Sequence, residues 1–428
     1  MPKQTENEAR ASFARKHFRR NYSLHFLEGG LFLGGIAFIA FDSVLPPIIQ
    51  SLGGPNWLIS LMPMMMFLGF MWPPLLMAHI TERLPRLKGF IMLFGIPQRV
   101  VFLLAGLALL FWADEYPVFV LVLVALAPLL SGLAGGVTWA AWVELTSRMI
   151  PPNRRSSLMA VRAVIGGLIG LLAGQIIRMI LERSPGAEGY AQLHFIAFGM
   201  LLTALVLFAF MKEPHQPSPE GGQRISLLKN LRSMPKILGD DHHFRRFIVS
   251  QCFGAGFFIM IPFLAIHALD TTGRSEAFLG LLVQAQMTGN IGSNLIAGWM
   301  GDRFGGKVVF VCAKVLFVIL SVGAIVNTTA WGFVSLFFIL GCATSFQMVG
   351  RSTLSIELCP DRRRPTYLAL LQFSIFPAML LAAALATAVR EIFGTLYPAA
   401  ILSTLFMTIS LIYLWRIPEP RYKGSQGT

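Results

Sequence analysis

Two carboxylates, Glu28 and Asp42, lie inside the first long apolar run of the chain, where an ionised group is costly to hold. If that run were one helix, their spacing is close to four turns, which would place both acids on one face about 21 Å apart along the axis. A carboxylate at such a depth can carry a coupling proton or pair with a basic group. It can equally stay ionised near a water interface, and the sequence leaves both interpretations open.

Arg99 is the basic residue whose position demands a partner. It lies near the middle of the apolar run 89–112, so its guanidinium needs a carboxylate, a water-filled cavity or an anionic substrate. A substrate-binding role and a structural pair with the first helix both fit. Arg162, Arg178 and Lys314 lie nearer the ends of their runs, where we expect long side chains to extend to the membrane surface.

Neutral amides form a stripe in the apolar run 278–300, because three of them recur at four-residue spacing and so share one helical face. Amides both donate and accept hydrogen bonds, which suits a hydroxylated solute. They suit hydrogen bonding between helices in lipid equally well. The residues predicted to bind substrate or to couple its transport are Glu28, Asp42, Arg99, Gln251, Gln286, Asn290, Asn294 and Gln347.

Twelve apolar runs must position these side chains. A chain of 428 residues with 55% hydrophobic and 13% charged residues has too much apolar surface for a water-soluble core. Each run approaches the roughly 20 helical residues that cross a bilayer core, and only helices or closed barrels satisfy the backbone in lipid. The sequence predicts an all-α membrane protein with spans at 23–49, 57–80, 89–112, 118–142, 158–180, 193–211, 247–268, 278–300, 308–326, 331–349, 367–389 and 397–415.

The basic residues predict the topology. The net charge of +14 is spread over short loops rather than gathered on one folded face, which argues against a nucleic-acid partner. The loops after odd-numbered spans hold only Arg183, Arg274 and Arg390, so both termini are expected in the cytoplasm. The predicted regions are a cytoplasmic tail 1–22, a six-helix bundle 23–211, a cytoplasmic loop 212–246, a second six-helix bundle 247–415 and a cytoplasmic tail 416–428.

The two predicted bundles carry similar loops. Glu82 and Arg83 follow the second span, and Asp302 and Arg303 follow the eighth. A proline followed two residues later by a pair of arginines comes after the fourth span and again after the tenth. The spacing between the loops differs in the two halves, so the likeness is weak, but it favours two pseudo-symmetric bundles with the site at their interface.

The segment Gly298 to Lys307, with its Gly-Asp-Arg core, resembles the loop signature of the major facilitator superfamily. The resemblance covers essentially the whole chain and implies that fold, with alternating access to a central site. It also implies that Asp302, Arg303 and Lys307 act as gating residues, and Glu82 and Arg83 in the first-half copy, which lacks the glycines. The alternative is that these charges only set topology and contact lipid.

No phosphate-binding loop and no nucleophile grouping is found in the sequence, so neither ATP-driven transport nor an enzyme is expected. We predict a proton-coupled symporter of a small polar solute, a sugar or an organic anion. The alternatives are an exporter of amphipathic compounds or lipids, and a transport-inactive sensor or scaffold. The expected partners are that solute, the proton and membrane lipid, with no cofactor, metal or nucleic acid. We expect a monomer in a bacterial inner membrane.

Overall fold

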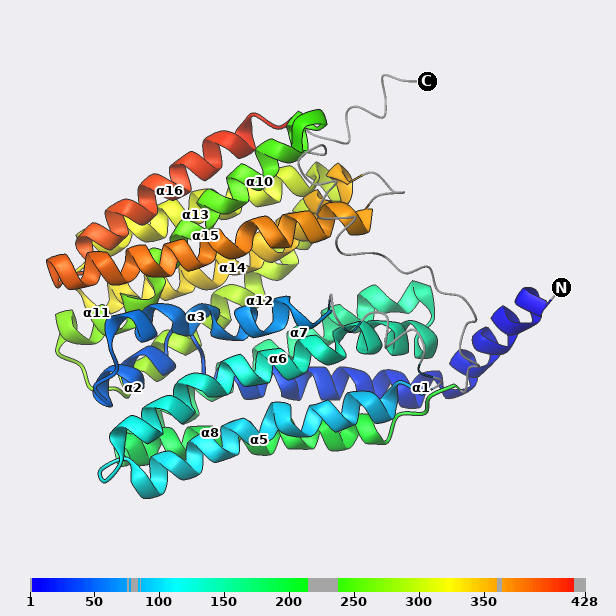
Figure 1. Cartoon of the computed structure of the whole chain (residues 1–428), viewed down its shortest axis with the longest axis horizontal. Coiled ribbons are helices and arrows are strands. Elements are labelled where there is room, and N and C mark those ends of the chain that lie inside the picture. Colours follow the sequence, from blue (N-terminus) through cyan, green and yellow to red (C-terminus); the bar gives the residue numbers. More distant parts are fainter. Residues whose placement is uncertain are drawn as a thin grey trace. The chain divides into compact units, whose positions relative to one another are not determined.

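The computed structural model describes residues 2–74, 77, 84, 86–214, 238–359 and 364–418, and these stretches are almost entirely helical (Figure 1). The chain divides into two compact units. Unit 1 contains Met1–Ala40 and Met65–Arg224, and unit 2 contains Phe41–Met64 and Ile225–Thr428. The segment Phe41–Met64 therefore groups with the C-terminal half of the sequence.

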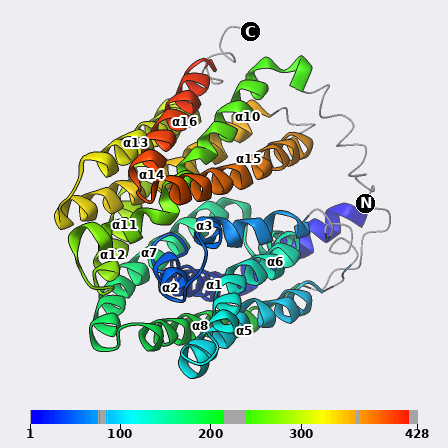
Figure 2. The ribbon, with the colours of Figure 1, turned by 60° about the vertical axis from the view of Figure 1, so that its left-hand side comes forward.

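Unit 1 is a helical bundle in which α1 packs on both α7 and α8, and α5 packs on both α6 and α8 (Figure 2). These long helices bury small and aliphatic side chains against one another and turn larger apolar side chains outward. The helices of unit 1 are α1 (Pro2–Ala37), α5 (Lys88–Trp112), α6 (Pro117–Met149), α7 (Pro152–Arg183) and α8 (Ala187–Ala209), joined by the second part of α3 (Asn56–Met71).

Unit 2 is built around α14, which packs on both α12 and α13, while α16 packs on α13 and α10. The short helix α2 lies against α11, and Ser60 at the start of α3 accepts a hydrogen bond from Thr387 of α15 at 3.0 Å. The helices of unit 2 are α2 (Leu45–Ser51), α10 (His242–Gly254), the 3-10 turn η1 (Ala255–Ile259), α11 (Ile261–Thr272), α12 (Phe278–Phe304), α13 (Gly306–Val326), α14 (Ala330–Leu358), α15 (Arg364–Phe393) and α16 (Tyr397–Trp415).

Helical segments coincide with all twelve predicted runs, but the prediction of one continuous helix over 23–49 is wrong. The helix α1 ends at Ala37 and α2 begins at Leu45, with turns between them. Pro46 and Pro47 lie in the first turn of α2, where a missing N–H costs no helical hydrogen bond, whereas one continuous helix through them would lose two such bonds. Glu28 and Asp42 therefore do not share a helix face.

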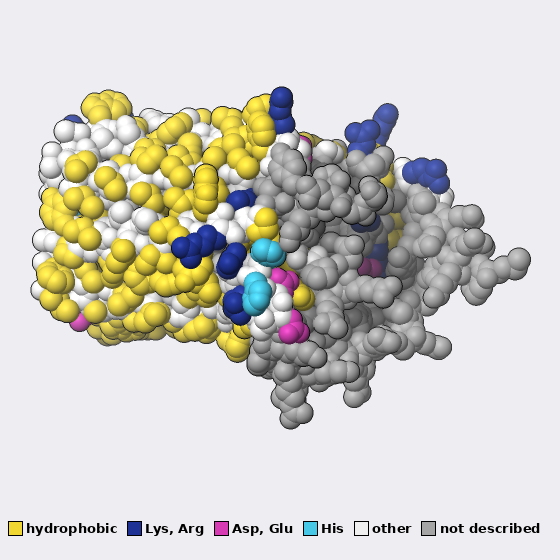
Figure 3. Space-filling model, turned by 90° about the horizontal axis from the view of Figure 1, so that it is seen from above, with side chains coloured by type: hydrophobic (Ala, Val, Ile, Leu, Met, Phe, Trp, Pro, Cys, Tyr) yellow, Lys and Arg dark blue, Asp and Glu magenta, His cyan; other side chains and the backbone are white. Residues whose placement is uncertain are grey.

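Apolar length marks this as a membrane protein. Within the described residues, nine helices are long and apolar enough to cross a bilayer. The helices α1, α3 and α12 are not among them, since α1 begins with a charged tail, α3 has 16 residues and α12 carries the amide stripe. Hydrophobic side chains cover most of the described surface in Figure 3, and charged and His side chains gather toward one end of it. That distribution is typical of helices that face lipid and end in water.

Close helix packing through glycine occurs at corresponding places in the two units. In unit 1, a Cβ on Gly132 of α6 would collide with the backbone of Met66 of α3. In unit 2, a Cβ on Gly341 of α14 would collide with the backbone of Gln286 of α12. Small residues that let backbones approach are typical of helix pairs in membranes. The second and fourth helices of each half are thus held by the same device.

Candidate functional site

A buried charge cluster in unit 1 joins α1 to α7. The Glu28 carboxylate accepts a hydrogen bond from the Arg162 guanidinium at 2.7 Å, in an ion pair whose side chains are 8% and 12% exposed. The same guanidinium nitrogen contacts the ring of His25 and donates to the His25 carbonyl oxygen at 3.1 Å. The other ring nitrogen of His25 lies 3.0 Å from the hydroxyl of Thr146 on α6. We call Glu28, His25 and Arg162 the acid cluster.

Helix geometry explains how this cluster forms. Residues 25 and 28 are three apart on α1 and so lie on one face of that helix. Gly29 leaves room for the guanidinium, because a Cβ there would collide with it. Arg162 lies over the Trp142 ring, 5.0 Å from its centroid, at a distance that allows a cation–π contact. The expectation that Arg162 extends to the membrane surface is therefore wrong.

The acid cluster places a carboxylate beside an imidazole, since the His25 ring lies 3.6 Å from the Glu28 carboxylate. Loss of the Glu28 charge would break the pair with Arg162 and leave that guanidinium buried without this counter-charge. His25, which is fully buried, offers a second protonatable group beside Glu28. His25 was not among the residues predicted from the sequence, although its three-residue spacing from Glu28 inside an apolar run was a usable signal.

Asp42 lies in the turns before α2 and contacts α12 within unit 2. Its carboxylate accepts a hydrogen bond from the side-chain amide of Gln286 at 2.7 Å and another from Ser43 at 3.3 Å. The structure therefore brings together two residues that the sequence predicted for one site. The Oε1 atom of Gln286 is buried and has no hydrogen-bond partner among the described residues.

The remaining amides are dispersed. Asn294 donates to Asn290 at 3.3 Å along α12, and the Asn290 carbonyl oxygen accepts from Ser345 of α14 at 3.0 Å. These contacts are of the kind that stabilise helix pairs. Gln251 on α10 is 5% exposed, and its Nε2 atom has no hydrogen-bond partner within the described part of the chain.

Arg99 is held by backbone oxygens rather than by an acid. Its guanidinium donates to the carbonyl oxygens of Leu201 on α8 and Gly95 on α5, both at 2.7 Å, and to the side chain of Gln98 at 3.0 Å. It also lies 5.7 Å from the centroid of the Phe32 ring on α1. Arg99 thus ties three helices of unit 1 together.

Unit 2 contains a buried cation whose position differs from the prediction. Lys314 is fully buried within α13, so the expectation that it reaches the membrane surface is wrong. Its ammonium donates to Gln347 of α14 at 2.9 Å and lies 4.6 Å from the centroid of the Phe310 ring. The helix α14 continues to Leu358, which places Arg351 inside a helix rather than in the loop expected there.

The predicted gating loop follows α12. Gly305 has φ +94°, a conformation that favours glycine, and it permits the tight turn from α12 into α13. Arg303 lies over the Trp299 and Phe304 rings, at 5.8 and 5.6 Å from their centroids. Lys307 donates to the carbonyl oxygen of Trp415 at 3.2 Å. Asp302 lies in the last turn of α12, and Glu82 and Arg83 fall outside the described residues.

Basic side chains cap helix C-termini in both units. Lys88 at the start of α5 donates to the carbonyl oxygens of Ala209 and Met211 at the end of α8, both at 3.0 Å. Lys307 at the start of α13 does the same at the end of α16. Cations are favourable there because helix C-termini carry partial negative charge. Lys307 therefore has a structural contact within its own unit.

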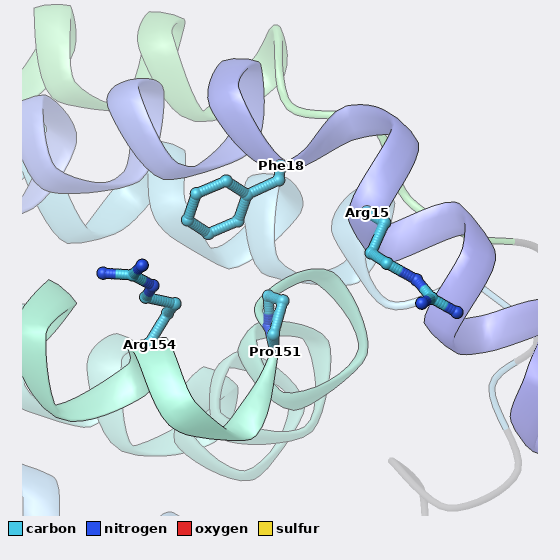
Figure 4. A pocket seen from close by; sticks show the side chains of 4 residues that line it. All are labelled: Arg15, Phe18, Pro151 and Arg154. Atoms are coloured by element: carbon cyan, nitrogen blue, oxygen red, sulfur yellow. The ribbon is translucent and has the colours of Figure 1, made fainter.

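A cavity of about 370 Å³ lies in unit 1, apart from the predicted site residues. It is lined by Arg15 and Phe18 of α1, Pro151, and Arg154 of α7 (Figure 4). Arg15 and Arg154 are exposed, as are the basic side chains expected at a membrane surface.

Known proteins resemble the chain in sequence and in fold. The family model described as Major Facilitator Superfamily matches residues 246–428. The multidrug resistance protein MdtG of Enterobacter lignolyticus is 24% identical over 351 residues, covering 79% of this chain and 78% of that protein. The 4-hydroxybenzoate transporter PcaK of Pseudomonas aeruginosa is 27% identical over 161 residues, covering 37% of this chain and 35% of that protein.

Solved structures share the fold over nearly the whole chain. A D-xylose-proton symporter matches with a TM-score of 0.70 at 16% identity, covering 95% of this chain and 99% of that one. The nucleoside transporter NupG matches with a TM-score of 0.68 at 13% identity, covering 93% and 98%. Residues 246–428 therefore resemble the Major Facilitator Superfamily in sequence, and the chain as a whole shares the fold of these solved transporters.

Proposed function

We propose that the protein is a proton-coupled symporter of a small polar solute, and that Glu28 is the residue that carries the coupling proton. The observation that supports this is the buried Glu28–Arg162 ion pair with His25 beside it. A carboxylate that exchanges its arginine partner for a proton changes the charge of a buried site, and such a change can be linked to a conformational change.

The named relatives support a polar cargo moved with protons. One solved structure of the same fold is a D-xylose-proton symporter, and one relative in sequence is a transporter of 4-hydroxybenzoate. The side chains that offer hydrogen bonds in unit 2, Gln251 and Gln286, each retain a buried amide atom without a partner in the described residues. Such atoms suit a polar solute, since an unsatisfied buried amide is costly.

Export of amphipathic compounds is the second candidate. It is favoured by the MdtG protein of Enterobacter lignolyticus, which is named a multidrug resistance protein and matches most of the chain. A symporter moves protons in the same direction as its substrate, whereas a proton-driven exporter moves them in the opposite direction. The same assay therefore separates them.

Proteoliposomes that contain a pH-sensitive dye test the coupling. D-xylose, 4-hydroxybenzoate and ethidium would be added outside in turn, against empty liposomes as the control for passive entry. We expect a sugar or an organic acid to acidify the lumen beyond that control, and Glu28→Gln to abolish the acidification while leaving solute exchange at equal pH. Acidification that survives in Glu28→Gln would reject Glu28 as the coupling residue. Proton release driven by ethidium would favour export.

We also propose that the loop after α12 is cytoplasmic and gates transport, as the resemblance in sequence implies. The contacts of Arg303 and Lys307 with α12 and α16 make these two residues structural in the present conformation. Asp302→Asn is expected to slow transport with normal expression, and Lys307→Gln to lower stability as well, because it removes a helix cap. Unchanged uptake by Asp302→Asn would remove the gating assignment.

A further inference from the structure

Unit 2 holds two cations that face no acid. Lys314 is fully buried, and its contacts are the Gln347 side chain at 2.9 Å and the Phe310 ring. Arg351 donates to the Gln372 side chain at 2.8 Å. Neither cation takes part in any ion pair found among the described residues. Within the described stretches, the hydrogen bonds of both cations go to neutral amide oxygens.

These side chains form one connected group across three helices. Gln347 and Arg351 are four residues apart on α14, so they are neighbours on one helix face. Lys314 reaches this face from α13, and Gln372 reaches it from α15. Arg351 is half-buried and Gln372 is exposed, whereas Lys314 lies fully inside. We call Lys314, Gln347, Arg351 and Gln372 the cationic cluster.

The described surroundings of the cluster do not supply a full negative charge. The Lys314 ammonium lies against Gly254 at the end of α10, where a Cβ would come within 2.5 Å of it. A helix C-terminus offers about half an elementary charge, which does not match two basic side chains. Buried charges in proteins are normally paired, and those at membrane depth commonly mark a path for substrate or ions. The absent counter-charge therefore points to a ligand.

We propose that the cationic cluster binds the carboxylate of an organic anion, so that the transported solute supplies the missing charge. This inference rests on the proposed transport function and narrows its cargo from polar solutes to carboxylates. Arg351 offers a planar guanidinium that can hold a carboxylate through two parallel hydrogen bonds. Lys314 adds a point charge behind it, and the Gln347 amide can rotate to donate its N–H groups to the same ligand.

Thermal unfolding of the purified full chain at constant ionic strength tests the proposal. The probes are 4-hydroxybenzoate, acetate and the neutral 4-hydroxybenzyl alcohol. The variants are Lys314→Gln and Arg351→Gln, with Arg178→Gln as the matched loss of a cation at an exposed pair on α7. We expect at least one carboxylate to raise the Tm of the unaltered chain and of Arg178→Gln. That shift should fall by half or more in Lys314→Gln and Arg351→Gln. The Tm shift that 4-hydroxybenzyl alcohol causes should be the same in all the variants.

Equal shifts in all variants would overturn the proposal, as would the lack of any carboxylate shift beyond that of the alcohol. A second readout is the ligand-free Tm of Lys314→Met. We expect it to equal or exceed that of the unaltered chain, because the variant removes an unpaired buried charge. A marked fall would assign Lys314 to the fold and reject the ligand site.

Failure of this inference differs from failure of the proposed function. Glu28→Gln should retain the carboxylate shift while it loses proton coupling. A retained shift together with intact proton coupling in Glu28→Gln would reject only the coupling role. If the unaltered chain couples transport to protons, but carboxylates shift the Tm of Lys314→Gln and Arg351→Gln as much as that of the unaltered chain, only the carboxylate site is rejected.

Discussion

The acid cluster of unit 1 and the cationic cluster of unit 2 solve the problem of buried charge in opposite ways. In the first, Arg162 lies 2.7 Å from the Glu28 carboxylate, and charge is balanced within the protein. In the second, Lys314 and Arg351 donate to amide oxygens and form no ion pair with any described residue. A balanced pair can be set by folding alone, whereas an unbalanced pair is complete only when something else binds. This difference is why we propose the first cluster as a proton site and the second as an anion site.

Breaking the balanced pair should have the largest effect. Glu28→Gln leaves Arg162 buried without a counter-charge, and Arg162→Gln does the same to Glu28, so each should cost about 3–5 kcal/mol of unfolding free energy. The double variant should cost less than the sum, because it removes both charges together. Chemical unfolding of the four proteins in detergent measures this. Additive losses would mean that the two side chains do not stabilise each other.

Adding a carboxylate to the cationic cluster should give unit 2 a buried ion pair like the one in unit 1. Gln347→Glu places a carboxylate beside the Lys314 ammonium and should stabilise the ligand-free protein by about 1–3 kcal/mol. It should also abolish stabilisation by 4-hydroxybenzoate, since the ligand's place is taken. Gln372→Glu, at the exposed edge of the cluster, is the control and should gain less. A loss of stability in Gln347→Glu would contradict the picture of an unpaired cation.

Arg99 provides a cation whose partners are backbone oxygens. Arg99→Gln removes its bonds to Leu201 and Gly95 and should cost about 1–2 kcal/mol. Stabilisation by carboxylates should remain, because Arg99 belongs to unit 1 and the cationic cluster belongs to unit 2. Loss of the carboxylate shift in this variant would return Arg99 to an anion-binding role. The thermal-shift titration described for the cluster variants decides between the two.

The smallest loss of unfolding free energy is expected at a solvent-exposed ion pair. Arg178 and Glu182 form an ion pair with side chains about half exposed, at 50% and 48%. Such pairs contribute roughly 0.5 kcal/mol or less. Arg178→Gln should therefore unfold within about half a kcal/mol of the unaltered chain in the same titration. A cost comparable to that of Arg162→Gln would show that exposure does not distinguish the two pairs.

Sequence alone predicted the fold class well, because long apolar runs and the basic residues between them follow directly from the bilayer. The prediction failed where a local signal was overlooked or where the burial of a side chain depends on a helix distant in the sequence. Pro46 and Pro47 were a local signal that the first run is not one helix. The burial of Lys314 could not be predicted from its place in one run, since Gly254 on α10 and Gln347 on α14 enclose it.

The sequence identified buried charged residues better than it identified the side chains that they contact. Glu28 and Arg99 drew attention because a charge in an apolar run is costly, and both are buried. Their contacts depend on which helices pack together, and that is set by shape rather than by any one residue. Arg162 met Glu28 only because α7 lies against α1. Arg351 was assigned to a loop because the end of α14 was placed too early.

The grouping of Phe41–Met64 with unit 2 has a consequence for biosynthesis. This segment leaves the ribosome early, but α11, α12 and α15, which it contacts, are made much later. Until then Asp42 lacks the amide of Gln286. A fragment ending at residue 224 would carry the segment without its neighbours, and a fragment starting at residue 225 would lack the segment. The two halves of the gene should therefore give a complete fold only when they are expressed together.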